Sequence, residues 1–132
     1  MRHRHKFLVI SDVPDNRFIF VRTLLRKFPD ALIEECQLST TAIGALQANV
    51  PSVILAHRSS DIDLGHLIPL LRHVSASVPI IAITGRNNPI EIAQLGANAV
   101  LTSDAWQVLD ELVDEVLLKP EQPLRTGGTA LD

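Results

Sequence analysis

The segment Pro51-Ser52-Val53-Ile54-Leu55-Ala56-His57 contains four consecutive apolar residues and ends in a histidine. A short apolar run without alternation is typical of a strand that is buried on both faces of a parallel sheet. The polar residue at the carboxyl end of such a strand lies where parallel sheets place their ligand sites. The segment therefore predicts an α/β fold and a candidate site at His57.

Strand and helix signals alternate five times along the chain. The expected strands are residues 7–10, 31–38, 53–56, 79–84 and 99–102. The expected helices are residues 15–27, 39–49, 66–75, 89–95 and 105–118, each starting or ending near a capping residue, proline or glycine. This alternation predicts a flavodoxin-like (βα)5 three-layer sandwich with an all-parallel sheet in the order 2-1-3-4-5.

Three local patterns make more specific predictions about the helices. The spacing of four apolar residues predicts the buried stripe of the first helix: Phe18, Val21, Leu25 and Phe28. Pro69 predicts a third helix that begins late, near His66, or is kinked, after an unusual loop over residues 58–65. Asp104 lies three residues before Gln107, which predicts a capping box for the last helix.

Length and composition limit the class of protein. The chain has 132 residues, enough for one domain, and a net charge of -3, which argues against nucleic-acid binding. Cys36 is the only cysteine, so no intrachain disulfide can form, which fits a reducing cytoplasm; we expect its thiol to be buried and inert. No apolar run is long enough to span a membrane. We assign residues 1–118 to the domain and residues 119–132, with Pro and Gly, to a flexible tail or linker stub.

The predicted strand order brings several polar residues together. Strands one and three flank the point where the order reverses, so Asp12 and His57 should be neighbours. Thr84 and Ser103 would approach from the ends of the next two strands. His66 and His73 are expected at the surface, and no metal-ligating set is evident around them.

Four segments in this order and spacing resemble the CheY-like receiver domain of bacterial response regulators. They are residues 7–14, residues 51–57 with Gly65 beyond them, residues 78–85 and residues 96–103. The resemblance extends from about Lys6 to Leu118 and implies the receiver fold. It also implies a site with a phospho-accepting aspartate, acids that hold Mg²⁺, a lysine, and a Thr or Ser hydroxyl that interacts with the phosphoryl group.

Most of the site positions implied by the resemblance are altered. His57 stands at the phosphoacceptor position, Ser11 and Asp12 at the acid pair, and Ser103 at the lysine position, whereas Thr84 retains the switch hydroxyl. Imidazole is a poor partner for a hard cation, so we expect weak or absent Mg²⁺ binding and no other cofactor. The resemblance is therefore to a degenerate receiver, or pseudo-receiver, and we expect no aspartyl phosphorylation.

Several roles for His57 stay open at the level of sequence. A hydrogen-bonded pair of His57 and Asp12 would form a static polar plug, or a pH-responsive switch in which the acid favours the charged imidazole. Phosphorylation of His57 itself is a third role. A fourth is anion binding, with Arg58, Ser59, Thr84 and Ser103 as possible anion contacts. A Ser-His-Asp hydrolase built on Ser11 or Ser103 lacks a nucleophile-elbow sequence.

We expect a cytoplasmic module of two-component or phosphorelay signalling that is not an enzyme and that acts by phosphorylation-independent protein–protein interaction. Its partner, a protein or a second copy of the chain, would bind through the first, fourth or fifth helix, without nucleic acid or membrane. One alternative is a conventional phosphorelay receiver with an altered site. Another is a small flavodoxin-like ligand-binding protein or enzyme, although Ser11-Asp12-Val13-Pro14 stands where a glycine-rich phosphate loop would follow the first strand.

Overall fold

A parallel sheet forms the centre of the structure, a computed structural model that describes residues 4–85, 89–118 and 125–127. The strands lie in the order β2-β1-β3-β4-β5-β6, which confirms the predicted order of the first five. The strands are β1 (Lys6–Ile10), β2 (Leu32–Cys36), β3 (Val53–His57), β4 (Ile80–Thr84), β5 (Ala99–Thr102) and β6 (Arg125–Gly127). The helices are α1 (Pro14–Lys27), α2 (Ser39–Ala48), α3 (Asp61–Val74), α4 (Pro89–Gln94), the 3-10 helix η1 (Ser103–Val108) and α5 (Leu109–Leu118).

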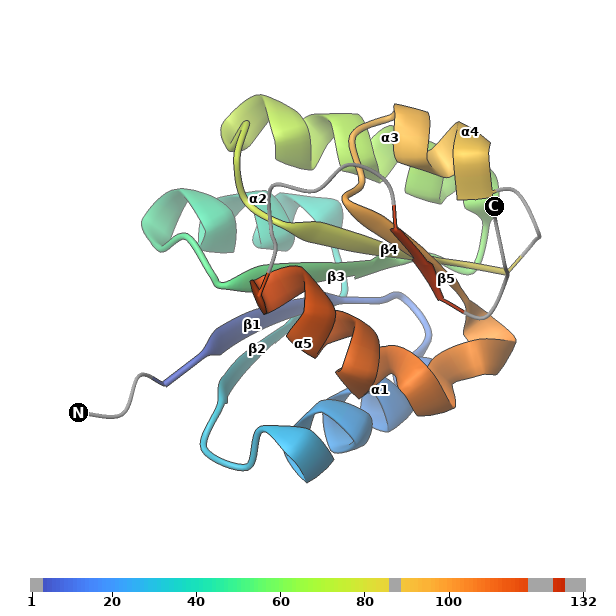
Figure 1. Ribbon diagram of the computed structural model, residues 1–132. Helices are drawn as coiled ribbons and strands as arrows, with labels where there is room; N and C mark the ends of the chain where they lie inside the picture. Colours follow the sequence, from blue (N-terminus) through green and yellow to red (C-terminus); the bar gives the residue numbers. More distant parts are fainter. Residues whose placement is uncertain (1–3, 86–88, 119–124, 128–132) are drawn as a thin grey trace.

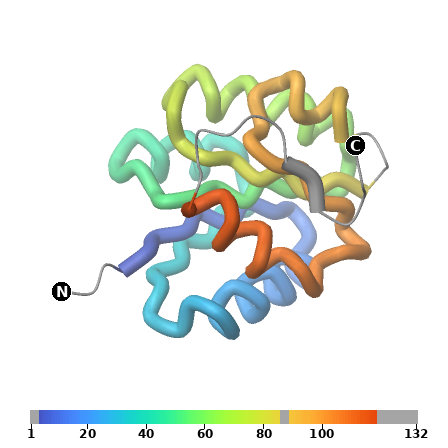
Figure 2. Tube along the Cα trace, viewed as in Figure 1, coloured from blue at the N-terminus to red at the C-terminus, as the bar shows by residue number. Residues whose placement is uncertain are grey.

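Helices cover both faces of the sheet, as strands without polar alternation require. Helices α2, α3 and α4 lie on one face, and α1 and α5 lie on the other (Figure 1). The Cα trace in Figure 2 moves back and forth between the sheet and these two layers. Val53 and Leu55 of β3 pack in the apolar cluster with α1 and α5, whereas Ile54 and Ala56 pack in the cluster on the other face. By this alternation, His57 belongs to the α1 side.

Strand β6 was not predicted from the sequence. Arg125–Gly127 pairs in parallel with β5, with Ala99 opposite Arg125 and Leu101 opposite Gly127. The segment expected as a flexible tail thus contributes a short edge strand to the sheet. The remainder of that segment, residues 119–124 and 128–132, lies outside the described residues.

The buried stripe of α1 differs from the predicted one. Phe20 and Leu24 are buried, whereas Phe18 is 60% exposed and Leu25 is 37% exposed. The helix carries two apolar stripes offset by about one residue, and periodicity alone does not separate them. The helix begins at Pro14, one residue before the predicted start, and has no side-chain cap.

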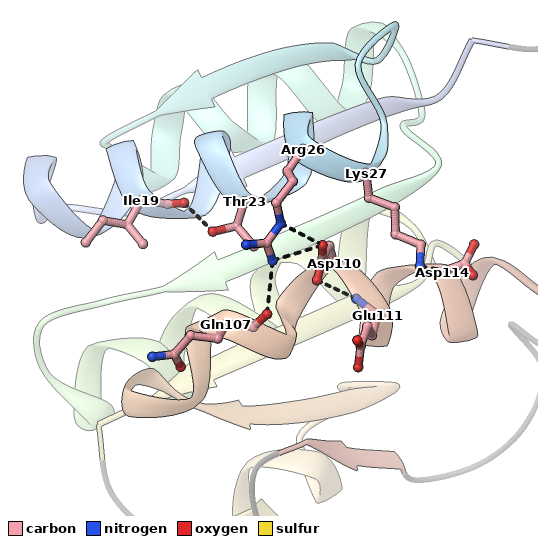
Figure 3. Close-up of polar contacts among 8 residues, drawn as sticks. All are labelled: Ile19, Thr23, Arg26, Lys27, Gln107, Asp110, Glu111 and Asp114. Carbon is pink, nitrogen blue, oxygen red and sulfur yellow. Dashed lines mark hydrogen bonds and ion pairs between the residues drawn. The ribbon is translucent and has the colours of Figure 1, made fainter.

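Polar contacts set α1 against α5, and Figure 3 shows them. Arg26 donates from Nε and Nη2 to Asp110 Oδ2 at 3.3 and 3.1 Å, and from Nη2 to the Gln107 carbonyl at 3.1 Å. Lys27 Nζ lies 3.8 Å from Asp114 Oδ2. Asp110 is buried, so pairing with Arg26 satisfies a carboxylate that would otherwise be costly to bury.

Helix α3 begins earlier than predicted, at Asp61 rather than near His66. The Ser60 hydroxyl caps it by accepting a hydrogen bond from the Asp63 amide at 3.4 Å. Pro69 lies inside the helix on an exposed face, and the packing of Leu64, Leu67, Ile68 and Leu71 offsets the hydrogen bond that proline cannot make. The loop after β3 is therefore only residues 58–60.

The last helix is also divided differently. Residues 103–108 form the 3-10 helix η1, whose N-cap is Thr102 without a side-chain cap, so the capping box predicted at Asp104 is not the start of the helix. The α-helix proper starts at Leu109 and buries Leu112, Val113 and Val116.

Two general expectations can be compared with the described residues. Cys36 is buried, and burial raises the pKa of its thiol, as expected for an unreactive cysteine. In the part of the chain that the structure describes, no helix has the length and apolar content to span a membrane.

Arg72 joins three elements at the amino edge of the sheet. Its guanidinium donates to the carbonyls of Gly96, Val78 and Ser75 at 2.7, 2.7 and 3.1 Å, and to Asn98 Oδ1 at 3.0 Å. Gly96 has φ +124°, and a Cβ there would lie 3.3 Å from the Arg72 side chain. The end of α3, the start of β4 and the turn before β5 are therefore held by one planar donor group.

We predict that Arg72→Lys lowers the free energy of unfolding by about 2–3 kcal/mol, because an ammonium cannot bond to all of these acceptors and leaves some of them unpaired. Chemical denaturation measures the change. Arg22→Lys, at an exposed position of α1, is the matched control and should alter stability by less than about 0.5 kcal/mol. Equal effects of the two substitutions would contradict the role of Arg72 in joining these three elements.

Candidate functional site

The carboxyl ends of four neighbouring strands bring the candidate residues to one edge of the sheet. Ser11 follows β1, His57 ends β3, Thr84 ends β4 and Ser103 follows β5. The strands are in parallel register, with Ile10 opposite Ala56, His57 opposite Ile83 and Thr84 opposite Thr102. Ser11, His57 and Thr84 are buried at this edge, whereas Ser103 is half-buried at the start of η1.

His57 is held by Ser11 and Phe20. Its Nδ1 lies 2.8 Å from Ser11 Oγ, and its ring meets Phe20 of α1 edge to face at 5.3 Å. Ser11 Oγ also accepts from the Val13 amide at 3.1 Å and lies 3.3 Å from the Val13 carbonyl. Both neutral tautomers satisfy this contact: Ser11 donates its proton to Nδ1, or Nδ1 donates to Ser11 Oγ while the hydroxyl donates to the Val13 carbonyl.

The environment of His57 opposes its positive charge. Burial lowers the pKa of His57 below its ordinary value, and the positive charge of Arg58 acts in the same direction. The carboxylates of Asp12 and Asp61 raise the pKa but do not outweigh burial. One of the open roles, a pH-responsive switch in which the acid favours the imidazolium, is not supported, because desolvation is the larger effect and favours the neutral imidazole.

Asp12 is paired with Ser59 rather than with His57. The Ser59 amide donates to Asp12 Oδ1 at 2.8 Å, and the Ser59 hydroxyl donates to Oδ2 at 2.7 Å. Burial raises the pKa of Asp12, whereas the hydrogen bonds from Ser59 lower it. The lowering effects together are larger, so the pKa lies below its ordinary value. The expected hydrogen-bonded His57–Asp12 pair is not the arrangement that the structure shows, because each partner has a nearer one.

Arg58 has a structural role in the loop after β3. It is buried, and it donates to the Gln37 carbonyl at 2.6 Å and to Ser39 Oγ at 2.8 Å. These bonds tie the β3–α3 loop to the start of α2. Two of the expected anion contacts, Arg58 and Ser59, thus direct their donors to acceptors of the protein itself.

Asp61, the first residue of α3, was not among the site residues expected from the sequence. The Thr84 hydroxyl donates to Asp61 Oδ2 at 2.8 Å, and the Gly85 amide donates to Oδ1 at 3.2 Å. Ser60 followed three residues later by Asp63 is a helix-start pattern that would have placed Asp61 at the sheet edge. Because of Pro69, the sequence prediction placed the start of the helix near His66, which left Asp61 in the loop.

The Ser11–His57 contact has the geometry of a nucleophile and its base. Ser11 is 0% exposed and His57 is 4% exposed, so a substrate cannot reach the hydroxyl. Asp12, the third member of the conceivable triad, gives its oxygens to Ser59. The pair therefore satisfies buried polar groups and does not make a hydrolase site. Among the described residues, no cluster of three or more His, Cys, Asp or Glu side chains is arranged to hold a metal ion.

The fold is that of response-regulator receiver domains, as comparison with solved structures shows. A two-component response regulator from Clostridium difficile has a TM-score of 0.77 at 22% identity, covering 90% of this chain and 100% of that chain. The isolated REC domain of RcsB from Salmonella enterica serovar Typhimurium has a TM-score of 0.76 at 20% identity, covering 92% and 93%. A LuxR-family two-component response regulator from an Aurantimonas strain has a TM-score of 0.75 at 13% identity, covering 93% and 90%.

The sequence gives no match in the two other comparisons. No protein-family model matches it, and no curated protein sequence matches it. The fold likeness therefore rests on three-dimensional structure, and the chemistry of the site has to be argued from the residues of this chain.

We predict that His57 makes stability depend on pH. Because its folded pKa lies below the unfolded value of about 6.5, the stabilisation is complete above that pH and is lost as pH falls toward the folded pKa. The free energy of unfolding should decline from about pH 7.5 to about pH 5.5, and His57→Gln should decline less over that window.

The matched control is His66→Gln on the exposed surface of α3, which should retain the decline of the wild-type protein. Urea denaturation at the two pH values measures all three proteins. A His57→Gln variant with an unchanged pH dependence would show that His57 is not held neutral by the fold.

Proposed function

We propose that the chain is an atypical receiver domain of two-component or phosphorelay signalling in bacteria that acts in the cytoplasm by protein–protein interaction, without an aspartyl phosphate. The observation that carries this proposal is the burial of His57 at the phosphoacceptor position, bonded to Ser11 and packed on Phe20. An incoming phosphoryl donor needs an accessible carboxylate there, and this chain offers a closed, neutral imidazole.

The donor set also argues against magnesium as a cofactor. Mg²⁺ requires hard oxygen ligands in near-octahedral geometry. The edge supplies two carboxylates, Asp12 and Asp61, whose oxygens already accept hydrogen bonds from Ser59 and from Thr84 and Gly85. The Ser11 hydroxyl and the His57 imidazole bond to each other. These residues do not fit the ion, and we propose no step that depends on it.

Acetyl phosphate tests the absence of phosphorylation. Incubation of the protein with acetyl phosphate and Mg²⁺, followed by intact-mass measurement, should give no adduct at the site, because no accessible acceptor is present. A receiver domain with an intact aspartate serves as the positive control in the same reaction. A single phosphoryl group mapped to His57 or Asp12 would overturn the proposal and favour a phosphorelay receiver with an altered site.

The surface of α1 is the partner surface that the structure favours among the three expected helices. A groove of about 680 Å³ lies between α1 and η1, lined by Phe18, Ile19, Arg22, Thr23, Leu25, Arg26 and Trp106. Phe18 is 60% exposed, and the Arg22 guanidinium lies 5.5 Å from the centre of its ring.

The residues around the groove indicate the chemistry of the partner. Exposed Phe18 and Leu25 provide apolar area, and Arg22 and Arg26 place positive charge beside it. Such a surface suits a protein segment that presents an apolar side chain flanked by carboxylates. We therefore propose an acidic, amphipathic partner segment at this groove.

Site-directed photo-crosslinking tests the groove. The photoreactive residue p-benzoylphenylalanine at position 18 should capture the partner in cells that express the protein, since this side chain projects from the folded surface. The same residue at position 50, where Val50 is 66% exposed outside the groove, is the control and should give no such product. Capture at position 50 but not at position 18 would exclude the α1 surface.

A further inference from the structure

Two hydrogen-bond donors at the end of β4 converge on one carboxylate. The Thr84 hydroxyl and the backbone amide of Gly85 bond to different oxygens of Asp61, at 2.8 and 3.2 Å. Two adjacent donors arranged to bond to two oxygens of one group form an oxyanion-binding cradle. In this chain the anion in the cradle belongs to the protein.

The position of Asp61 is set by the helix that it begins. Asp61 is the first residue of the 14-residue helix α3, and Ser60 caps that helix. A carboxylate in the first turn is favoured by the helix dipole, and Leu64, Leu67 and Ile68 anchor the helix to the core. The acid therefore reaches Thr84 from a rigid element and not from a free loop.

By the receiver resemblance, Thr84 stands at the position whose hydroxyl interacts with a phosphoryl group. We propose that Asp61 is a built-in ligand for this position: its carboxylate occupies the Thr84–Gly85 cradle in place of an external oxyanion. The end of β4 is thereby held in an anion-bound arrangement without phosphorylation. This inference rests on the proposed function and specifies how the switch hydroxyl is controlled in it.

An in-chain ligand has an advantage over a dissolved one. Asp61 is tethered beside the cradle, so its effective concentration is high, and an external anion must displace it. The negative charges of Asp61 and Asp12 near the same edge also repel a second anion. The cradle should consequently be closed to phosphate in the wild-type protein and open once the Asp61 carboxylate is removed.

Titration with inorganic phosphate, followed by ¹H–¹⁵N NMR of the Gly85 amide, tests the proposal. Asp61→Ala should show a saturable shift of this amide, with an affinity for phosphate about tenfold or more above that of the wild-type protein. Asp61→Ala combined with Thr84→Val should lose the effect. The matched control is Asp63→Ala, an exposed acid in the same turn of α3, which should behave as the wild-type protein does.

Asp61→Asn covers the case in which the alanine variant does not fold. It keeps the side-chain volume but removes the charge, and the Gly85 amide proton should move upfield as it loses its carboxylate acceptor. Saturable phosphate binding at Gly85 in the wild-type protein, with an affinity equal to that of Asp61→Ala, would overturn the inference. An unshifted Gly85 amide in Asp61→Asn, or no phosphate binding by a folded Asp61→Ala protein, would also do so.

The two proposals fail in different ways. A phosphoryl adduct formed from acetyl phosphate would remove the proposed function whatever the NMR titration shows. An unreactive wild-type protein whose Asp61 variants leave Gly85 unchanged would retain the proposed function and remove Asp61 as its internal ligand.

Discussion

Burial of the strand ends between two helical layers requires the chain to satisfy its own polar groups at that edge. Ser11 and Thr84 are 0% exposed and His57 is 4% exposed, so water cannot serve as their partner. Among the described residues, no buried side-chain nitrogen or oxygen lacks a hydrogen-bond partner. Two pairings at this edge, Ser11 with His57 and Thr84 with Asp61, follow from this constraint.

These pairings give the receiver-like fold a different chemistry at its edge. A site for phosphoryl transfer needs hydrogen-bond donors and acidic side chains that are free to bind a ligand reversibly. Here the Ser59 and Thr84 donors bond to the protein's own carboxylates, and the residue at the acceptor position is a neutral imidazole. Such an edge is suited to holding one conformation, which the interaction surface proposed at the α1 groove would need from its scaffold.

The architecture could be predicted because its signals are local and repeated. Apolar runs such as Val53 to Ala56 define buried parallel strands, and the alternation with helices leaves few topologies. The predictions that failed concern which face of a helix is buried and which of two local signals sets the start of a helix. Phe18 was predicted to be buried in place of Phe20, because two adjacent stripes of α1 are both apolar. The start of α3 was placed too late, because the prediction relied on Pro69 and not on the cap at Ser60.

The chain by itself specified five strands, since periodicity depends only on the linear pattern, and the alternation with helices left few possible strand orders. It also specified most of the residues at the carboxyl edge, but not Asp61. By the receiver resemblance, His57 stands at the position of the phospho-accepting aspartate. Which residues at this edge bond to one another depended on distances and burial in the tertiary structure. Asp12 lies closer to Ser59, and Asp61 reaches Thr84 because α3 begins there. Burial against Phe20 keeps His57 neutral despite two nearby acids.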